Sequence, residues 1–429
     1  MPEVRGTQPL LEGLEALLSS DREELLIGFG HGAVDSDWLL LVDGCRLAGE
    51  HEVKRDANGL HWTGELTSAL YAEAKSSDRG VVLIHAHGGQ GRLPQPSRTD
   101  LKTADEILPH FGMLLPDVPH AYVVVNRTNA CGWMQLANDR KGVEDVRVST
   151  LPIRHWPSEV VGEPKPLTRD DRPARALGSR GIGAIRRSTI GIVGLGGAGS
   201  QVAEMLAHAG VGHLILVDAD VVKEVNLSRT HGTTPEAIGE FKVATAGRLV
   251  ARISPESKVT TVEEAFPSRS LLRVLRDVDV IISCVDNPNA RNEVNRFSLR
   301  YAIPLIDLGT TISEEPFRVD GHLSVVVPGS HCLRCLGHVS DVILAADAEA
   351  ARGGRYGMSE GRPQVVSFNG LLASAAVTET LKLLTGFAGN SFTSMEWHYD
   401  AVGGELRRIK TADGRCRECS WYSFKGDGA

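Results

Sequence analysis

Two histidines and a downstream aspartate are the first residues in the chain whose types and spacing predict chemistry. His85 and His87 end a short apolar run, and Asp100 follows after a stretch rich in glycine and proline. Alternation along an extended chain places both imidazoles on one face. Two imidazoles and one carboxylate leave one position of a zinc ion open for water, as in catalytic sites. These residues are therefore predicted to hold a catalytic Zn²⁺.

Four of the seven cysteines form two C-x-x-C pairs far apart in the sequence, Cys332 with Cys335 and Cys416 with Cys419. The N-terminus has no apolar region of the kind found in signal peptides, so this spacing favours metal over disulfides. Four thiolates complete the tetrahedral shell of Zn²⁺ and leave no position open. The predicted site is therefore structural, and it would tie the C-terminal segment to the body of its domain.

A glycine-rich turn between an apolar strand and a helix predicts a phosphate site. The sequence G-x-G-x-x-G is formed by Gly194, Gly196 and Gly199, with Gly197 inside it. Glycines let the backbone approach a phosphate, and the N-terminus of the following helix offers unpaired N–H groups. Asp218 ends the next strand, where a carboxylate accepts hydrogen bonds from ribose hydroxyls. This motif alone does not separate NAD from ATP.

Residues farther along the chain resemble the ThiF/MoeB/E1 superfamily, whose members adenylate the C-terminal glycine of ubiquitin-like proteins. The matching segments are Asn226–Arg229, Lys242 and Cys284–Asn287, with Asp171–Ala176 resembling the arginine-finger segment. The resemblance runs roughly from Arg169 to Ser420 and consists of several motifs in order, so it is more specific than a glycine turn alone. It implies ATP and Mg²⁺ as the ligands.

The resemblance also implies roles for single residues. Arg229 and Lys242 would gather positive charge around the phosphates from the same subunit, and Arg172 would do so from the partner subunit of a homodimer. Asp286 suits Mg²⁺, which prefers oxygen ligands. The predicted nucleotide contacts are completed by Asp220, Asn226 and Asn287.

The chain departs from this family at two places. Pro173 and Thr230 stand where the family usually has glutamine. E1 enzymes that form a thioester carry a cysteine in the loop after the first cysteine pair, but residues 336–368 contain none, and the expected position falls beside Ser359. Either the reaction stops at the adenylate, or Ser359 forms an oxyester in place of the thioester. An ordinary loop serine is the simpler interpretation, because serine is a weak nucleophile without a base.

The histidine pair, together with Ser97-Arg98-Thr99-Asp100, resembles the JAB/MPN (JAMM) metalloprotease motif. In that family H-x-H is followed by S-x-x-D, an upstream glutamate acts as the base, and the bond after the C-terminal glycine of a ubiquitin-like protein is cut. The resemblance implies that Ser97 helps to hold the oxyanion and that Glu24 is the base. The gap between His87 and Ser97 is longer than usual, and a metal-free pseudo-enzyme remains the alternative.

The elements that must position these residues form two domains. Residues 1–155 read as a mixed α/β JAB/MPN-like domain, 156–175 as a proline-rich linker with the arginine-finger segment, and 176–429 as the adenylation domain. From Ser188 onward strands and helices alternate, which predicts a Rossmann-like, doubly wound parallel sheet. The expected helices include 10–18, 65–75, 101–108 (stopped by Pro109), 198–209, 241–253 and 371–384, and the expected strands include 25–27, 39–42, 81–84, 122–125, 189–193, 214–217 and 278–283.

The composition of the chain limits the classes of partner that we expect it to bind. The 429 residues are 42% apolar and 23% charged, with a formal net charge of −8. These values are ordinary for a globular protein and do not favour nucleic acid. No apolar run approaches the roughly 18–20 residues of a spanning helix. We therefore expect a cytoplasmic protein without membrane or nucleic-acid partners.

Taken together, the sequence predicts an E1-like enzyme fused to a JAMM-like zinc peptidase, as in bacterial ubiquitin-like conjugation systems. Its partner would be a ubiquitin-like protein ending in glycine, with or without an E2-like protein. Three alternatives remain open: activation of a sulfur carrier, as in MoeB and ThiF; a scaffold that binds a ubiquitin-like protein without chemistry; and an NAD oxidoreductase.

Overall fold

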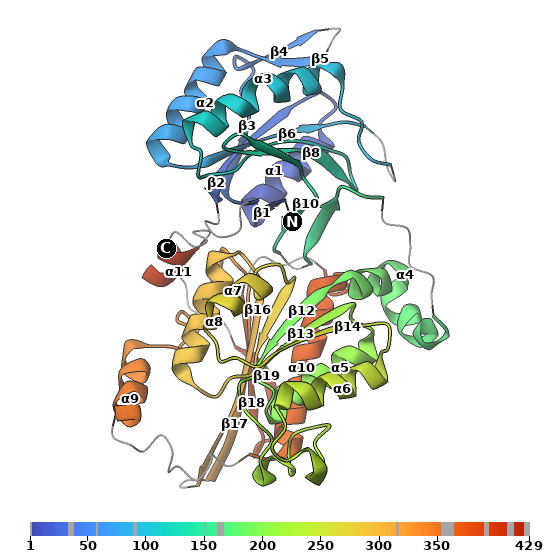
Figure 1. Ribbon diagram of the computed structural model, residues 1–429, viewed down its shortest axis with the longest axis vertical. Helices are drawn as coiled ribbons and strands as arrows, with labels where there is room; N and C mark the ends of the chain where they lie inside the picture. Colours follow the sequence, from blue (N-terminus) through green and yellow to red (C-terminus); the bar gives the residue numbers. More distant parts are fainter. Residues whose placement is uncertain are drawn as a thin grey trace. The chain divides into compact units, whose positions relative to one another are not determined.

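The computed structural model describes residues 2–32, 38–56, 59–88, 92–150, 152–160, 167–314, 317–352, 364–389, 394–409 and 416–423. The chain divides into two compact units, which consist chiefly of residues 1–162 and of residues 163–299 with 303–420. Each unit contains one large sheet covered by helices (Figure 1). No helix in these described ranges is both long and apolar enough to cross a membrane.

The first unit is built on a nine-stranded mixed sheet in the order β11-β10-β1-β3-β2-β6-β7-β8-β9, with a separate hairpin of β4 and β5. Its strands are β1 (Glu3–Gly6), β2 (Leu25–Gly32), β3 (Leu39–Leu47), β4 (Val53–Asp56), β5 (Gly59–Trp62), β6 (Gly80–Ala86), β7 (His120–Val125), β8 (Ala130–Leu136), β9 (Asp139–Gly142), β10 (Asp145–Val148) and β11 (Arg154–Pro157), and its helices are α1 (Gln8–Ser19), α2 (Gly64–Ser77) and α3 (Arg98–Leu114).

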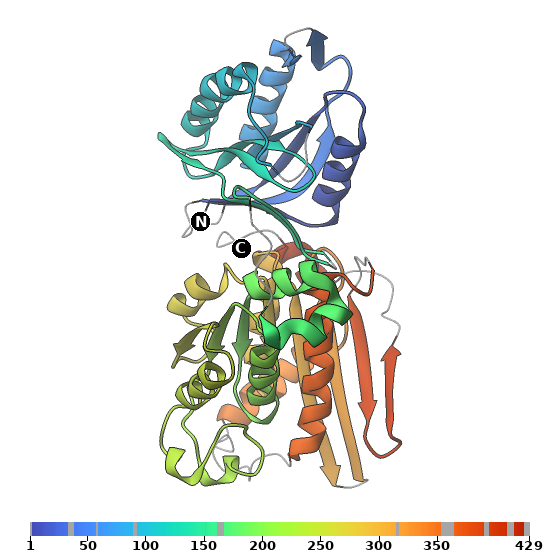
Figure 2. The same ribbon diagram turned by 90° about the vertical axis from the view of Figure 1, so that its right-hand side faces the viewer.

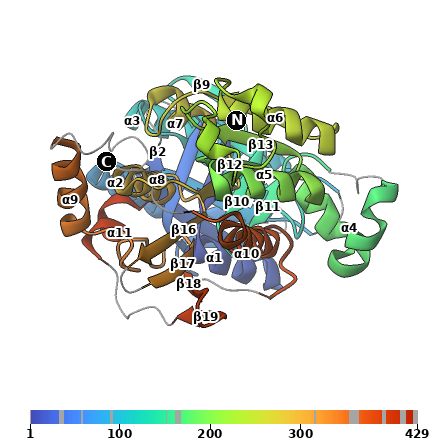
Figure 3. The same ribbon diagram turned by 90° about the horizontal axis from the view of Figure 1, so that it is seen from below.

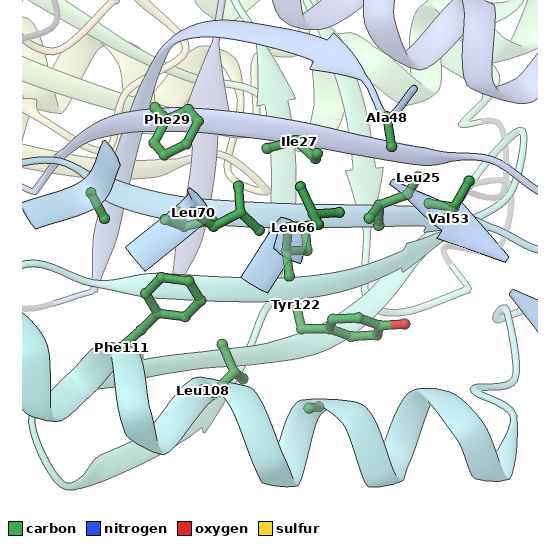
Figure 4. Packing of buried hydrophobic residues seen from close by; sticks show 14 of the residues in the cluster. Leu25, Ile27, Phe29, Ala48, Val53, Leu66, Leu70, Leu108, Phe111 and Tyr122 are labelled. Carbon is green, nitrogen blue, oxygen red and sulfur yellow. The ribbon is translucent and has the colours of Figure 1, made fainter. Parts of the chain in front are cut away.

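Helices cover both faces of this sheet because β2 is apolar on both sides. Leu25, Ile27 and Phe29 belong to the buried cluster under α2 and α3 (Figure 4). Leu26 points the other way, where its side chain meets α1 at Gly13. Such a run of apolar residues is typical of a strand that is buried on both faces.

Helix α3 corrects one prediction. The proline at position 109 was expected to end this helix, but α3 continues through it to Leu114. Leu108 and Phe111, on either side of the proline, are both buried in the core. Burying two large apolar side chains is worth roughly 3–6 kcal/mol, which offsets the hydrogen bond that proline cannot donate.

The second unit has an eight-stranded sheet in the order β14-β13-β12-β15-β16-β17-β18-β19. Its strands are β12 (Thr189–Val193), β13 (His213–Val217), β14 (Lys258–Val262), β15 (Val280–Ser283), β16 (Leu305–Glu314), β17 (Phe317–Val326), β18 (Met395–Asp400) and β19 (Glu405–Ile409). Its helices are α4 (Asp171–Arg187), α5 (Gly197–Ala209), α6 (Lys242–Ile253), α7 (Arg269–Leu275), α8 (Pro288–Arg300), α9 (Asp341–Arg352), α10 (Val366–Thr385) and α11 (Arg417–Tyr422), with 3-10 turns at Thr168–Asp170, Glu224–Asn226 and Pro235–Ala237.

The predicted doubly wound parallel sheet is confirmed for the first five strands only. Strands β14, β13, β12, β15 and β16 run parallel, whereas β17, β18 and β19 extend the sheet antiparallel. Helix α10 packs along this sheet against α5 and β16 (Figure 2). The first five strands therefore have the order of a nucleotide-binding Rossmann sheet.

The segment predicted as a linker is more ordered than expected at both ends. β11 pairs with β10, so Pro157 closes a strand of the first unit. α4 begins at Asp171 and carries Arg172 on its exposed surface. The proline-rich composition did not reveal either element.

We expect Gly112→Ala to destabilise the first unit, because α3 there touches the end of β8. A Cβ at Gly112 would lie 2.2 Å from the carbonyl oxygen of Ala137. Overpacking of this kind costs about 1–3 kcal/mol, which calorimetry of the full chain would detect as a lower transition temperature. Gly64→Ala at the start of α2 is the matched control, since a Cβ there meets no atom within 4 Å. Equal stability of both variants would contradict the close packing of α3.

Candidate functional site

The first unit brings together the three residues that were predicted to hold a metal. His85 is the last residue but one of β6, His87 directly follows that strand, and Asp100 lies in the first turn of α3. His85 Nδ1 lies 3.1 Å from Asp100 Oδ1, and His87 Nε2 lies 3.2 Å from Asp100 Oδ2. The potential ligand atoms of the three side chains all lie within 4.8 Å of one another. Two imidazoles and a carboxylate at these separations fit a zinc ion.

Asp100 is held in place as a carboxylate. Its Oδ2 accepts a hydrogen bond from Ser97 N at 2.6 Å, while Ser97 Oγ accepts from Asp100 N at 3.1 Å, so the two residues cap α3. The Tyr122 hydroxyl donates to Oδ1 at 2.6 Å. Burial acts to raise the pKa of Asp100, but the hydrogen bonds from His85, His87, Tyr122 and Ser97 outweigh it and lower the pKa far below its usual range.

The two imidazoles are less completely satisfied than the carboxylate. The hydrogen bond to Asp100 raises the pKa of His87, whose Nδ1 lies 2.7 Å from the carbonyl oxygen of Gln95. His85 Nε2 is buried and has no hydrogen-bond partner among the described residues. A buried ring nitrogen without a partner is uncommon in folded proteins, and a missing ion is one cause.

A cavity of about 750 Å³ opens beside these residues, and it is lined by Glu23, the neighbour of the predicted base Glu24. Glu23 lines the cavity together with His85, His87, Ser97 and Asp100. The Glu24 carboxylate does not line it and instead pairs with Arg55 Nη2 at 3.1 Å. Leu25 lies opposite His85 in the pairing of β2 with β6. Alternation beyond Leu25 places Glu23, and not Glu24, on the histidine side.

The second unit has its pocket at the carboxyl ends of β12 and β15, the central neighbours of the parallel sheet. This is where ligands bind in doubly wound folds. The pocket has a volume of about 770 Å³. Its lining includes Gly194, Gly196, Gly197, Asp218, Asp220, Asn226, Arg229, Lys242, Asp286 and Asn287, all of which were predicted as nucleotide contacts.

The glycine turn has the geometry that the motif predicts. Gly194 has a φ of 91°, a left-handed conformation that favours glycine. A Cβ at Gly199 would lie only 1.9 Å from the carbonyl oxygen of Gly194. The start of α5 can therefore approach the end of β12 closely, which leaves the N–H groups of its first turn near the pocket.

Two of the cationic side chains that line the pocket, Lys242 and Arg229, already have partners. Lys242 Nζ lies 2.7 Å from Asp220 Oδ2 and 3.8 Å from Asp218 Oδ2. Burial raises the pKa of Asp218 despite the nearby ammonium, while Leu195 N donates to its Oδ2 at 2.7 Å. Arg229 Nη1 donates to the carbonyl oxygen of Val225 at 2.7 Å. Lys242 is only 9% exposed, so its charge acts in a partly desolvated environment, where it is stronger than in water.

The four paired cysteines also converge. The Sγ–Sγ separation is 4.0 Å between Cys332 and Cys335, 3.7 Å between Cys332 and Cys416, 3.4 Å between Cys335 and Cys419, and 3.6 Å between Cys416 and Cys419. Zn–S bonds of about 2.3 Å place tetrahedral sulfurs about 3.8 Å apart. The cluster therefore has the size and shape of a tetrathiolate zinc site.

Ion pairs join the same two segments. Glu418, between the cysteines of the second pair, accepts from Arg334 Nε at 2.9 Å and from Arg296 Nη2 at 2.6 Å. Leu333 N donates to Asn295 Oδ1 at 3.0 Å. The arginines and Asn295 tie both cysteine pairs to α8.

One predicted residue lies elsewhere, and another falls outside the described part of the chain. Arg172 does not line the pocket of its own chain. Ser359 falls in residues 353–363, outside the described part of the chain. The sequence named Glu23 only as a second choice of base after Glu24, and it did not reveal Asn369, Asp307 and His322 at or beneath the second pocket. No motif marks the last three, because they reach the pocket from β16, β17 and α10.

Comparison with known proteins identifies the second half of the chain. A model of the ThiF family matches residues 170–420. Molybdopterin-synthase adenylyltransferase of Escherichia coli K12 is 28% identical over 53% of this chain and 84% of its own length. Ubiquitin-like modifier-activating enzyme 5 of Dictyostelium discoideum is 32% identical over 47% of this chain and 54% of its own length.

A third relative, the adenylyltransferase and sulfurtransferase MOCS3 of Mus musculus, is 31% identical over 54% of this chain. The chain spans about half the length of this relative and of the Dictyostelium enzyme. Among solved structures, E. coli MccB in complex with MccA-N7isoASN has a TM-score of 0.50 and 19% identity over 59% of this chain and 75% of MccB, which shows a shared fold. Because the family match covers more than half of the chain, this protein belongs to the ThiF family.

Proposed function

We propose that the second unit uses ATP and Mg²⁺ to adenylate the C-terminal carboxylate of a small acceptor protein. The observation that carries this proposal is the convergence of the glycine turn, Lys242 and Asp286 on one pocket at the switch point of the sheet. The ThiF family match supports it, and it favours ATP over the NAD that a glycine turn alone would also allow.

Different residues of the pocket suit different parts of the bound nucleotide and metal. The first turn of α5 offers N–H groups to phosphate, and Asp218 offers a carboxylate to the ribose hydroxyls. Lys242 and Arg229 offset the charge of two anionic reactants, the carboxylate and the triphosphate. Asp286 and Asn287 offer oxygen ligands, which suit Mg²⁺. When bound, the metal would neutralise phosphate charge and help pyrophosphate to leave.

The acceptor that fits best is a ubiquitin-like protein or a sulfur-carrier protein ending in glycine. The relatives named above include both an enzyme named for activating ubiquitin-like modifiers and adenylyltransferases named for molybdopterin synthase and sulfur transfer. Two later steps would distinguish conjugation from sulfur transfer. They are transfer of the acyl group to Ser359 and its transfer to an E2-like protein.

Arg172 is proposed to act in the pocket of a partner subunit in a homodimer. Its guanidinium is exposed on α4 and does not reach the pocket of its own chain. An arginine supplied by a second copy would add positive charge at the phosphates only after the dimer has formed.

The first unit is proposed to be a zinc-dependent peptidase that trims or releases the same acceptor. His85, His87 and Asp100 would hold the ion, whose bound water has a pKa near ~7. Glu23 would take a proton from that water, since its side chain lines the same cavity as Ser97 and the two histidines. His85 Nε2 is buried without a hydrogen-bond partner among the described residues and belongs to the cluster with His87 and Asp100, which favours a bound metal over a metal-free pseudo-enzyme.

The cysteine cluster is proposed to bind a structural Zn²⁺. We expect the purified full chain to contain two zinc ions and Cys416→Ser to contain one. This variant should also unfold roughly 5 °C or more below the wild type, because a structural metal contributes folding free energy. Cys45→Ser alters a thiol outside both clusters, and it should keep both ions. Unchanged zinc content in Cys416→Ser would exclude the proposed site.

We expect Asp286→Ala to slow ATP–pyrophosphate exchange, measured with the acceptor protein present, on the order of 10²-fold, because metal and phosphates lose an oxygen ligand. Asp277→Ala, on the surface outside the pocket, is the matched control and should exchange at the wild-type rate. If Asp286→Ala kept full exchange, the metal side of the pocket would be misassigned.

Adjacent glutamates give a sharp test of the peptidase. Glu23→Gln should abolish cleavage of an acceptor precursor carrying residues after its terminal glycine, while zinc content stays the same, because the base is not a ligand. Glu24→Gln removes the same charge one residue later, where the carboxylate pairs with Arg55, and should still cut. Activity in Glu23→Gln together with loss in Glu24→Gln would restore Glu24 as the base.

A further inference from the structure

A buried amide at the wall of the nucleotide pocket has an unused donor. Asn369, in the first turn of α10, is 3% exposed and lines the pocket. Its Oδ1 accepts a hydrogen bond from Thr310 Oγ1 at 3.1 Å. Its Nδ2 is buried and has no hydrogen-bond partner among the described residues. Leaving such a donor unpaired costs about 1–3 kcal/mol, so it requires an explanation.

The free donor faces the glycine turn. A Cβ built on Gly197 would lie 2.3 Å from Asn369 Nδ2. Gln201 Nε2 donates to the carbonyl oxygens of both Gly197 and Val366 at 3.0 Å, which joins the first turns of α5 and α10. These helices lie side by side (Figure 3). The amide is therefore fixed beside the phosphate site.

The order of the strands decides which ligand group Asn369 can meet. Asp218 follows β13 on one side of β12, whereas Thr310 belongs to β16 on the other side, beyond β15. The ribose assigned to Asp218 therefore lies away from Asn369. With the ribose on the Asp218 side, the acceptor carboxylate is the reactant left for the Thr310 side of the phosphates.

The basic side chains on the Thr310 side of the pocket, Arg291 and His322, already pair with the Asp307 carboxylate. Arg291 Nε donates to both carboxylate oxygens of Asp307, at 3.1 and 2.9 Å, and its Nη2 donates to the carbonyl oxygen of Val285 at 2.7 Å. His322 Nε2 lies 2.9 Å from Asp307 Oδ2, and burial lowers the pKa of this histidine. A carboxylate entering here would meet a neutral donor before it meets an unpaired cation.

We propose that Asn369 Nδ2 donates a hydrogen bond to one oxygen of the acceptor's C-terminal carboxylate and keeps that bond to the acyl oxygen of the adenylate. A neutral donor orients one oxygen without neutralising the charge that the other needs for attack. That other oxygen forms a bond to the α-phosphorus, while the bond to the bridging oxygen breaks and its electron pair leaves with pyrophosphate. No proton moves. This proposal rests on the adenylation proposed above.

The test uses the full chain and two probes that do not require the natural acceptor. They are AMP and 5′-O-(N-glycylsulfamoyl)adenosine, a stable analogue of glycyl-AMP that carries the acyl oxygen. Calorimetric titration should show that Asn369→Ala weakens binding of the analogue about tenfold, as expected for one lost hydrogen bond, and leaves AMP binding unchanged. Asn369→Asp should weaken the analogue further, because a carboxylate has no donor and carries negative charge.

Two other variants separate orientation from general damage. Thr310→Val removes the hydroxyl that orients the amide and should give a smaller loss for the analogue only. Ser367→Ala lies in the same turn of α10 with its side chain exposed, and it should bind both probes as the wild type does. Unchanged AMP binding in the three variants that add no charge, Asn369→Ala, Thr310→Val and Ser367→Ala, also shows that the pocket has folded.

The outcomes are distinguishable. Equal loss of AMP and of the analogue in Asn369→Ala would overturn the proposal, because the donor would then serve the phosphate. Full binding of the analogue by Asn369→Ala would also overturn it, since no contact to the acyl group would exist. A wild-type chain that binds neither probe would overturn the adenylation itself, and this proposal with it.

Discussion

The close approach of α5 to the end of β12 is the constraint on which the second unit depends. A side chain at Gly199 would collide with the backbone at Gly194, so only glycine allows the helix to begin where it does. From this contact follow the orientation of the N–H groups toward the pocket and the position of Gly197 against Asn369. Gln201, on the same helix, then fixes α10 through its bond to Val366. One backbone contact thus places the phosphate site and the wall beside it.

The first unit is organised around a carboxylate. Asp100 is nearly inaccessible, yet it accepts hydrogen bonds from a helix cap, a tyrosine and two histidines. Burial alone would favour the neutral acid, and the donors reverse this preference. The result is a fixed negative charge that orients both imidazoles. The same carboxylate caps α3, so the structure of the helix and the geometry of the site are not independent.

The two units are arranged to bind ligands of opposite charge, and they do so by different physical means. In the second, Lys242 and Arg229 are held by carboxylate and carbonyl oxygens until an anionic ligand competes for them. In the first, ligands for a cation surround a cavity that Glu23 also lines. If both proposals hold, the chain would carry an activating site and a cleaving site for the same C-terminal glycine. The cysteine cluster is part of neither of these two sites. Its proposed effect is to stabilise the fold of the C-terminal segment.

The sequence by itself determined those features whose geometry is local. The glycine turn, the C-x-x-C pairs and the alternation of strands with helices depend on neighbours a few residues apart, and the structure reproduces each of them. Tertiary structure decided the rest. Glu23 and Glu24 are adjacent and chemically identical, and only the pairing of β2 with β6 selects which one faces the histidines. Pro109 lies inside a helix because distant strands bury Leu108 and Phe111. Asn369 reaches the pocket from far along the chain, and no local pattern marks it, because its role depends on contacts with α5 and β16 that form only when the sheet assembles.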